Sequence, residues 1–131
     1  MSRSRRDTGS PFSDSRGYHV PERDFLQAVR DYARLMGWAD YHTWHSLHSP
    51  SGFPDLVLVR PPRVIFAELK SEKGQVSSSQ EVWLKLLQNC PGVECYLWRP
   101  SDWEQIVRIL KTRDERANTS SERRDSVRRR R

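Results

Sequence analysis

The sequence has few of the residues that form disulfides, and it has no run of residues that could cross a membrane. Its two cysteines, Cys90 and Cys95, flank Pro91-Gly92 without the spacing of a metal site. We expect free thiols, one of them packed, in a reducing and intracellular environment. No apolar run approaches the roughly 18 residues of a membrane helix, and the N-terminus lacks the apolar segment of a secretory signal. We therefore expect no membrane partner.

Several catalytic signatures are also missing. There is no Gly-rich loop of the P-loop type, which argues against a nucleotide cofactor and an ATP-driven motor. There is no Gly-x-Ser-x-Gly motif and no Cys/His arrangement for nucleophilic catalysis. His42, His45 and His48 are close in sequence, but residues 42 and 45 of an extended strand point to opposite faces. This spacing disfavours a zinc site, which needs converging ligands.

The positive charge lies at the two ends of the chain. Of the net charge of +6, residues 1–20 contribute four Arg against two Asp, and residues 111–131 contribute nine Lys/Arg against four acids. Residues 21–110 are close to neutral, with ten Lys/Arg against eleven Asp/Glu. We predict disordered tails over 1–20 and 114–131 and one folded domain over 21–113. An Arg-rich tail can neutralise phosphates or can simply favour solubility, and the sequence leaves both interpretations open.

Hydrophobic periodicity predicts three helices and four strands. A helix opening at Pro21-Glu22 and ending at Gly37 has apolar residues at spacings of three and four. A second helix, capped by one of the serines 77–79, and a third, capped by Ser101, follow later. The residues expected on the buried sides of these three helices are Phe25, Leu26, Val29, Tyr32, Ala33 and Met36; Val82, Trp83, Leu86 and Leu87; and Trp103, Ile106, Val107 and Leu110. With strands near 41–45, 56–59, 64–70 and 93–98, the order is α-β-β-β-α-β-α, which predicts an α/β fold with a mixed sheet flanked by helices.

Two of the strands read as a β-hairpin that carries charged side chains. The runs 56–59 and 64–70 are separated by Arg60-Pro61-Pro62-Arg63, a turn sequence. Asp55 begins the outgoing strand and Glu68 lies near the end of the returning strand, so the antiparallel pairing brings them side by side. Glu68 and Lys70 point to the same face. Two carboxylates beside apolar strands need a compensating charge, and Mg²⁺ or Mn²⁺ would supply it through oxygen ligands. The alternative is a solvated hairpin end with a surface Glu–Lys pair.

These residues also carry a resemblance to a known family. Pro54-Asp55 followed by Glu68-Leu69-Lys70 resembles the Pro-Asp…(Asp/Glu)-x-Lys signature of restriction-endonuclease-like nucleases. Together with Gly52-Phe53, Gln80 and the segment 98–102, it is similar to the VRR-Nuc family of small phage and repair nucleases. The likeness runs from about residue 22 to residue 110, and the α-β-β-β-α-β-α order agrees with the restriction-endonuclease-like core.

The resemblance implies a site and a chemistry. It implies one or two Mg²⁺ or Mn²⁺ ions held by Asp55, Glu68, the main-chain carbonyl of Leu69 and a glutamate of the first helix. Glu22 matches that glutamate, with Asp24 as the nearby competitor and helix-dipole stabilisation as the alternative role. Lys70 would position the attacking water or stabilise developing negative charge. Gln80 would orient this group, unless it serves only as a helix-capping residue.

The implied substrate is DNA, cleaved by phosphodiester hydrolysis. Stand-alone members of the family are similar to Holliday-junction resolvases that work as homodimers, so a homodimer acting on branched DNA is the expectation. Residues expected to contact nucleic acid are His42, His45, Ser51, Lys73 and Arg99. The alternatives are a nuclease acting on flaps, nicks or duplex ends, and a non-catalytic nucleic-acid-binding module.

Overall fold

The elements follow the predicted order. The computed structural model describes residues 11–12, 19–43 and 48–113. Its elements are α1 (Glu22–Leu35), β1 (Ala39–His42), β2 (Leu56–Arg60), β3 (Arg63–Leu69), α2 (Ser78–Gln88), β4 (Glu94–Trp98), a 3₁₀ turn (Pro100–Asp102) and α3 (Trp103–Lys111). The expected α/β class with a mixed sheet flanked by helices is confirmed.

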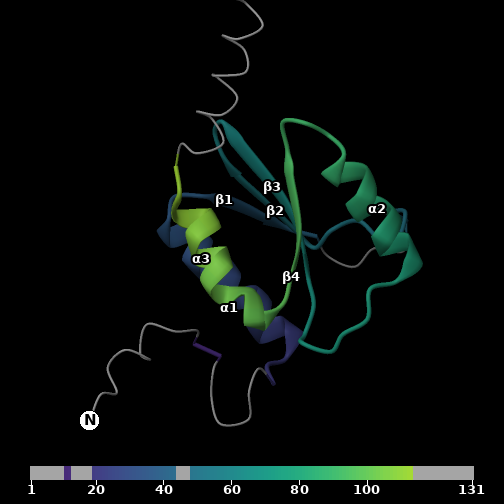
Figure 1. Ribbon diagram of the computed structural model, residues 1–131, viewed down its shortest axis with the longest axis horizontal. Coiled ribbons are helices and arrows are strands. Elements are labelled where there is room, and N and C mark those ends of the chain that lie inside the picture. Colours follow the sequence, from purple (N-terminus) through teal and green to yellow (C-terminus); the bar gives the residue numbers. More distant parts are fainter. Residues whose placement is uncertain (1–10, 13–18, 44–47, 114–131) are drawn as a thin grey trace, which may run out of the picture.

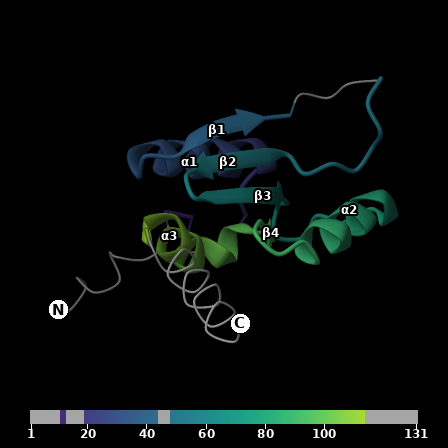
Figure 2. The ribbon, with the colours of Figure 1, turned by 90° about the horizontal axis from the view of Figure 1, so that it is seen from above.

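The four strands form one sheet in the order β1-β2-β3-β4. The pairs β1–β2 and β2–β3 are antiparallel, whereas β4 lies parallel to β3. The parallel pair requires a crossover, which α2 provides. Figure 1 shows α1 and α3 together on one side of the sheet and α2 on the other, and Figure 2 shows β1, β2 and β3 stacked in order.

The hydrophobic core lies between the sheet and the pair α1–α3. In α1, the side chains of Phe25, Val29 and Ala33 are inaccessible to solvent and repeat every four residues. Gly37, with a φ of +89°, ends the helix as predicted, because a left-handed residue is required there. The fully buried partners from the rest of the core are Leu56, Leu58, Ile65, Ala67, Leu69, Ile106 and Leu110, with Trp98 at 2 % exposure.

The predicted buried side of α2 was partly wrong. Leu84 is the buried residue of this helix, while Val82 and Leu86 are each 56 % exposed. Trp83 is half-buried, and its ring packs edge-on against Phe53 with centroids 5.1 Å apart. Five apolar residues between positions 82 and 87 surround most of the helix, so periodicity alone could not choose the face.

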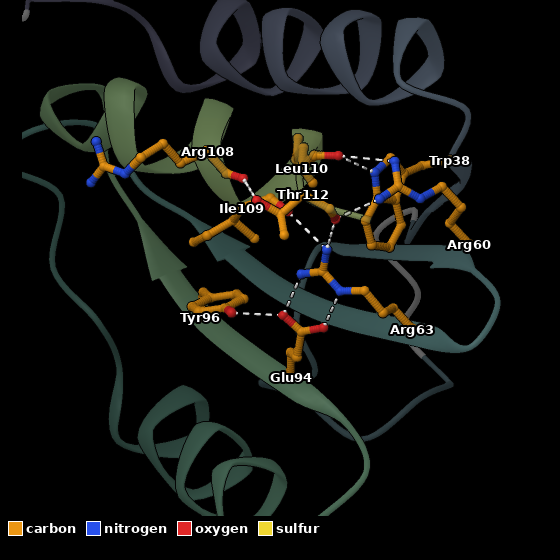
Figure 3. A network of polar contacts seen from close by, with 9 residues as sticks. All are labelled: Trp38, Arg60, Arg63, Glu94, Tyr96, Arg108, Ile109, Leu110 and Thr112. Atoms are coloured by element: carbon orange, nitrogen blue, oxygen red, sulfur yellow. Dashed lines mark hydrogen bonds and ion pairs between the residues drawn. The ribbon is translucent and has the colours of Figure 1, made fainter. Parts of the chain in front are cut away.

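The two arginines that flank the exposed Pro61-Pro62 turn of the hairpin belong to a buried polar network (Figure 3). The Arg63 guanidinium donates to both oxygens of Glu94 at 2.7 Å, and Nη1 of Arg60 donates to the Leu110 carbonyl at 3.0 Å. Both guanidinium groups also donate to the carbonyl of Thr112 and lie over the ring of Trp38. The two arginines therefore satisfy the last carbonyls of α3, at the end of the hairpin opposite Asp55 and Glu68.

Three smaller expectations meet the structure here. Ser101 does not cap α3: the 3₁₀ turn precedes that helix, and the Ser101 hydroxyl donates to Glu72 at 2.7 Å. Phe12, inside the segment predicted to be disordered, packs against Phe25 with ring centroids 5.6 Å apart, because its ring can cover the end of the core. Of the two free cysteines, Cys95 is buried as expected for one of the pair.

The predicted tails lie mostly outside the described residues, so the domain limits of 21–113 stay a prediction. Every helix and strand of the described part falls between Glu22 and Lys111. Among these helices, none is sufficiently long and apolar to cross a membrane.

Candidate active site

The hairpin brings Asp55 and Glu68 together at its open end, as the sequence predicted. Leu56 pairs with Ala67, so the residues just before and just after this pair are neighbours. Asp55 Oδ2 accepts a hydrogen bond from the main-chain N–H of Leu69 at 3.2 Å. The Asp55 carboxyl is also within hydrogen-bonding reach of the Glu68 carboxyl. The carboxyl groups of Asp55, just before β2, and Glu68, in β3, therefore lie next to each other.

The segment before Asp55 is fixed by close packing. The Thr43 N–H donates to the carbonyl of Asp55 at 2.8 Å, which continues the pairing of β1. Phe53 packs edge-on between Phe66 of β3 and Trp83 of α2. Gly52 has a φ of +97°, and a Cβ atom built there would lie 2.5 Å from the carbonyl oxygen of Ser79. A glycine is therefore required, and it lets the loop lie directly on the first turn of α2.

Glu68 lies in an environment that opposes its charge. The residue is 1 % exposed, and its Oε1 atom has no hydrogen-bond partner. Burial first, and then the Asp55 carboxylate, raise the pKa of Glu68 to about 8, although the Lys70 ammonium acts in the opposite direction. A buried carboxylate oxygen that faces a second carboxylate and lacks a donor is an unfavourable arrangement without a cation.

Two side chains act on the other oxygen of Glu68. Nε2 of Gln80 donates to Oε2 at 2.8 Å, and the Lys70 ammonium lies 3.9 Å from the same atom. Gln80 also forms a capping box, in which its Oε1 accepts from the Ser77 N–H at 2.9 Å while its own N–H donates to Ser77 Oγ. The two roles that the sequence left open for Gln80, capping and orienting, are therefore both compatible with its position.

Glu22 belongs to the same electrostatic neighbourhood. Burial raises the pKa of its carboxyl, the Asp55 carboxylate adds to the rise, and the Lys70 ammonium and the main-chain N–H of Ser71 oppose it. Asp24, the competing candidate, has a side chain 61 % exposed and lies 3.9 Å from the guanidinium of Arg23. Both acidic residues in the first turn of α1 are exposed, and Glu22 is the one whose carboxyl interacts electrostatically with Asp55 and Lys70 of the site.

The oxygen ligands of the site suit a hard cation whose remaining ligands are waters or substrate oxygens. Within residues 19–43 and 48–113, no three His, Cys, Asp or Glu side chains converge tightly enough to hold a metal by themselves. Asp55 and Glu68 are the converging pair, with Glu22 near them and the buried Leu69 directly after Glu68 in the sequence. Mg²⁺ takes one or two carboxylates and keeps waters and substrate oxygens, so two carboxylates and an unpartnered oxygen fit it.

The residues predicted to contact nucleic acid are scattered around this site. Ser51 and Lys73 are exposed, on the loops before β2 and after β3, and His42 is half-buried at the end of β1. His45 lies outside the described residues. Arg99 is half-buried, and its Nη1 donates to three main-chain carbonyls of the loop after β3. The structure does not test DNA contact for any of them.

The sequence missed the residues that support the site from behind. Glu72 accepts hydrogen bonds from the N–H and the hydroxyl of Ser101, which ties the loop after β3 to the end of β4. No local signal could identify this pair, because the two residues are 29 positions apart. The Ser77-x-x-Gln80 spacing, in contrast, is the sequence signature of a capping box, and the capping role that the sequence left open for Gln80 is present in the structure.

Comparisons with known proteins agree with this arrangement. The family model described as "VRR-NUC domain" matches residues 18–100, which contain the hairpin, Gln80 and β4. A solved structure titled "VRR_NUC domain protein" superposes with a TM-score of 0.57 at 12 % sequence identity, covering 75 % of this chain and 91 % of that one. No curated protein gives a significant match. The family match over most of the chain, supported by the shared fold, shows that the protein belongs to the VRR-NUC domain family.

Proposed function

We propose that the protein is a metal-dependent endonuclease that hydrolyses phosphodiester bonds of DNA with Mg²⁺ or Mn²⁺. The observation that carries the proposal is the pairing of the buried Glu68 with the half-buried Asp55, in which one oxygen of Glu68 has no hydrogen-bond donor. A buried carboxylate held beside a second carboxylate would cost several kcal/mol without a compensating cation. Family membership supports a nuclease as the class of enzyme.

Each residue has a defined part in the proposed reaction. Asp55 and Glu68 would hold one or two ions, supported by Glu22 and the carbonyl of Leu69. The chemistry that the bound cation supplies is activation of a water and neutralisation of charge on the phosphate. Lys70, whose side chain is 15 % exposed, would position the water or stabilise negative charge that develops on the phosphate oxygens. Gln80 holds Glu68 in place from the first turn of α2.

For the substrate, we propose branched DNA, of the four-way-junction type, bound by a homodimer. A domain of this size offers one site, and two sites related by a two-fold axis suit a symmetric branched substrate. The exposed Val82 and Leu86 of α2 supply apolar surface for such a contact. Sedimentation that finds only monomers at micromolar concentration, with and without DNA, would contradict the dimer.

The decisive test is cleavage of a labelled panel of four-way junction, flap, nicked duplex, linear duplex and single strand. Each substrate is incubated with Mg²⁺, Mn²⁺ or EDTA. Asp55→Asn and Lys70→Ala should lose cleavage by several orders of magnitude while retaining DNA affinity, because both act at the reacting phosphate. Arg108→Ala, which removes an exposed cation in the last turn of α3, is the matched control and should cut at the wild-type rate.

The panel also separates the alternatives. Preferred cutting of flaps, nicks or ends would keep the nuclease and replace the junction substrate. Binding of DNA without cutting by the wild type, under all metal conditions, would favour the non-catalytic module. Cleavage by Asp55→Asn at the wild-type rate would show that the site is wrongly assigned.

A further inference from the structure

One side chain, Arg99, binds several main-chain carbonyls of the loop directly after β3. Its Nη1 atom donates to the main-chain carbonyls of Ser71 at 2.7 Å, Gly74 at 2.9 Å and Glu72 at 3.2 Å. Arg99 is the residue that follows the last residue of β4. A side chain directly after β4 therefore binds three carbonyls of the loop after β3, which contains no helix or strand.

Two further contacts join the same segments. The Lys70 N–H donates to the carbonyl of Trp98 at 3.0 Å, one residue before Arg99. The Glu72 carboxylate accepts from the Ser101 N–H at 3.0 Å and from its hydroxyl at 2.7 Å. Lys70 thus stands between two anchors: its own N–H is bound to β4, and the carbonyl of the next residue is bound to Arg99.

We propose that Arg99 is a positioning residue of the candidate active site rather than a direct contact to DNA. By fixing the carbonyl of Ser71, it holds the backbone that carries the Lys70 ammonium near Glu68. The same anchor holds the main-chain N–H of Ser71 toward Glu22. This inference rests on the proposed nuclease function, because the residues that Arg99 would position, Lys70 and Glu22, belong to the proposed active site.

The geometry explains why an arginine is needed. A lysine at position 99 would keep the charge but would end where Cζ lies, short of the nitrogen that meets the three carbonyls. Residues that orient the groups of a metal site typically cost about 10–100-fold in metal affinity or activity when they are replaced. A displacement of about 1 Å at Lys70 can cost on the order of 100-fold in rate.

The test uses the full-length protein with Arg99→Lys and Arg99→Ala. Three quantities are measured: the single-turnover cleavage rate at saturating DNA, Mn²⁺ affinity of the DNA-free protein, and DNA affinity in Ca²⁺ as a function of salt. Amide exchange at Gly74, whose N–H donates to the Ser71 carbonyl at 3.1 Å, reports on the loop independently of catalysis. Lys73→Ala removes an exposed cation from the same loop and is the comparison for loss of positive charge without loss of the carbonyl contacts.

If Arg99 is a positioning residue, both variants cut about 10–100-fold more slowly and exchange Gly74 faster, while DNA affinity and its salt dependence stay at the wild-type values. If Arg99 contacts a phosphate, Arg99→Ala weakens binding and lowers the salt slope by about 0.9, and Arg99→Lys restores much of both. That second pattern overturns the inference, as does a wild-type cleavage rate in Arg99→Ala.

The remaining outcomes are also informative. If Arg99→Ala fails to fold, Glu72→Gln, which weakens the second anchor to Ser101, should show the same pattern to a smaller extent, and wild-type behaviour in it overturns the inference. If the wild-type protein neither binds Mn²⁺ nor cuts DNA, the proposed function fails and the inference fails with it. If the wild-type protein cuts DNA and only the Arg99 variants cut slowly, the proposed nuclease function stands and the result bears on the positioning role of Arg99 alone.

Discussion

Replacing Glu68 by glutamine should stabilise the metal-free protein. The Glu68 side chain is buried beside Asp55, and its pKa is raised from an ordinary 4.5 to about 8. A carboxyl with a raised pKa in the folded state binds a proton there that it loses on unfolding. Its ionisation therefore costs stability progressively from about pH 4.5 upward, at about 1.4 kcal/mol per pH unit, and the full cost is present above about pH 8.

The glutamine variant removes this cost because its side chain resembles the protonated acid. Its amide N–H can face Asp55, and its carbonyl can accept the hydrogen bond that Gln80 donates at 2.8 Å. The difference in unfolding free energy between Glu68→Gln and wild type should be small near pH 4.5. It should grow to several kcal/mol by pH 8, because each pH unit between about 4.5 and about 8 adds up to about 1.4 kcal/mol.

Urea unfolding in EDTA at half-unit intervals from pH 4.5 to 9 measures this difference. Glu81→Gln, at an exposed site in the first turn of α2, is the matched control and should parallel the wild type. Saturating Mg²⁺ or Mn²⁺ should stabilise the wild type at pH 8 and leave Glu68→Gln unchanged. A difference that stays constant or shrinks as the pH rises would refute the electrostatic account of the site.

Two other substitutions test the scaffold. Gly52→Ala should lower the unfolding free energy by about 1–3 kcal/mol, because φ at this residue is +97° and the new Cβ would lie 2.5 Å from the Ser79 carbonyl oxygen. Urea unfolding measures this loss, and wild-type stability would show that the loop can move away from α2. Arg63→Leu should cost about 3–5 kcal/mol, because it removes the cation that donates to both oxygens of the buried Glu94. The double variant Arg63→Leu/Glu94→Leu should recover a large part of that loss, and equal losses in both variants would contradict the assignment of the cost to the Glu94 charge.

Local signals were sufficient for the elements and for the central pair of acids. The four-residue spacing of Phe25, Val29 and Ala33 identified α1, and the two apolar runs on either side of the Pro61-Pro62 turn identified the hairpin. Because a hairpin is a local structure, its open end could be predicted to join Asp55 to Glu68.

Long-range contacts were not predictable in the same way. The parallel pairing of β4 with β3 depends on how α2 crosses the sheet, and nothing in the segment 94–98 encodes its neighbour. Arg60 and Arg63 looked like charged residues of a turn, yet both are buried because the last carbonyls of α3 reach them. The loop contacts of Arg99 span 25 to 28 positions and depend on the same pairing.

The side chain of Gln80 makes two hydrogen bonds of opposite kind, and together they limit which amino acids this position can accept. One end of its side chain must accept a hydrogen bond from Ser77, and the other end must donate to Glu68. Glutamate, the usual partner in a capping box, meets the first requirement but would bring a further negative charge against an already crowded carboxylate. Lysine could donate but not accept. Only an amide of this length has both chemical characters, so a glutamate in the corresponding place of a relative would indicate a differently charged centre.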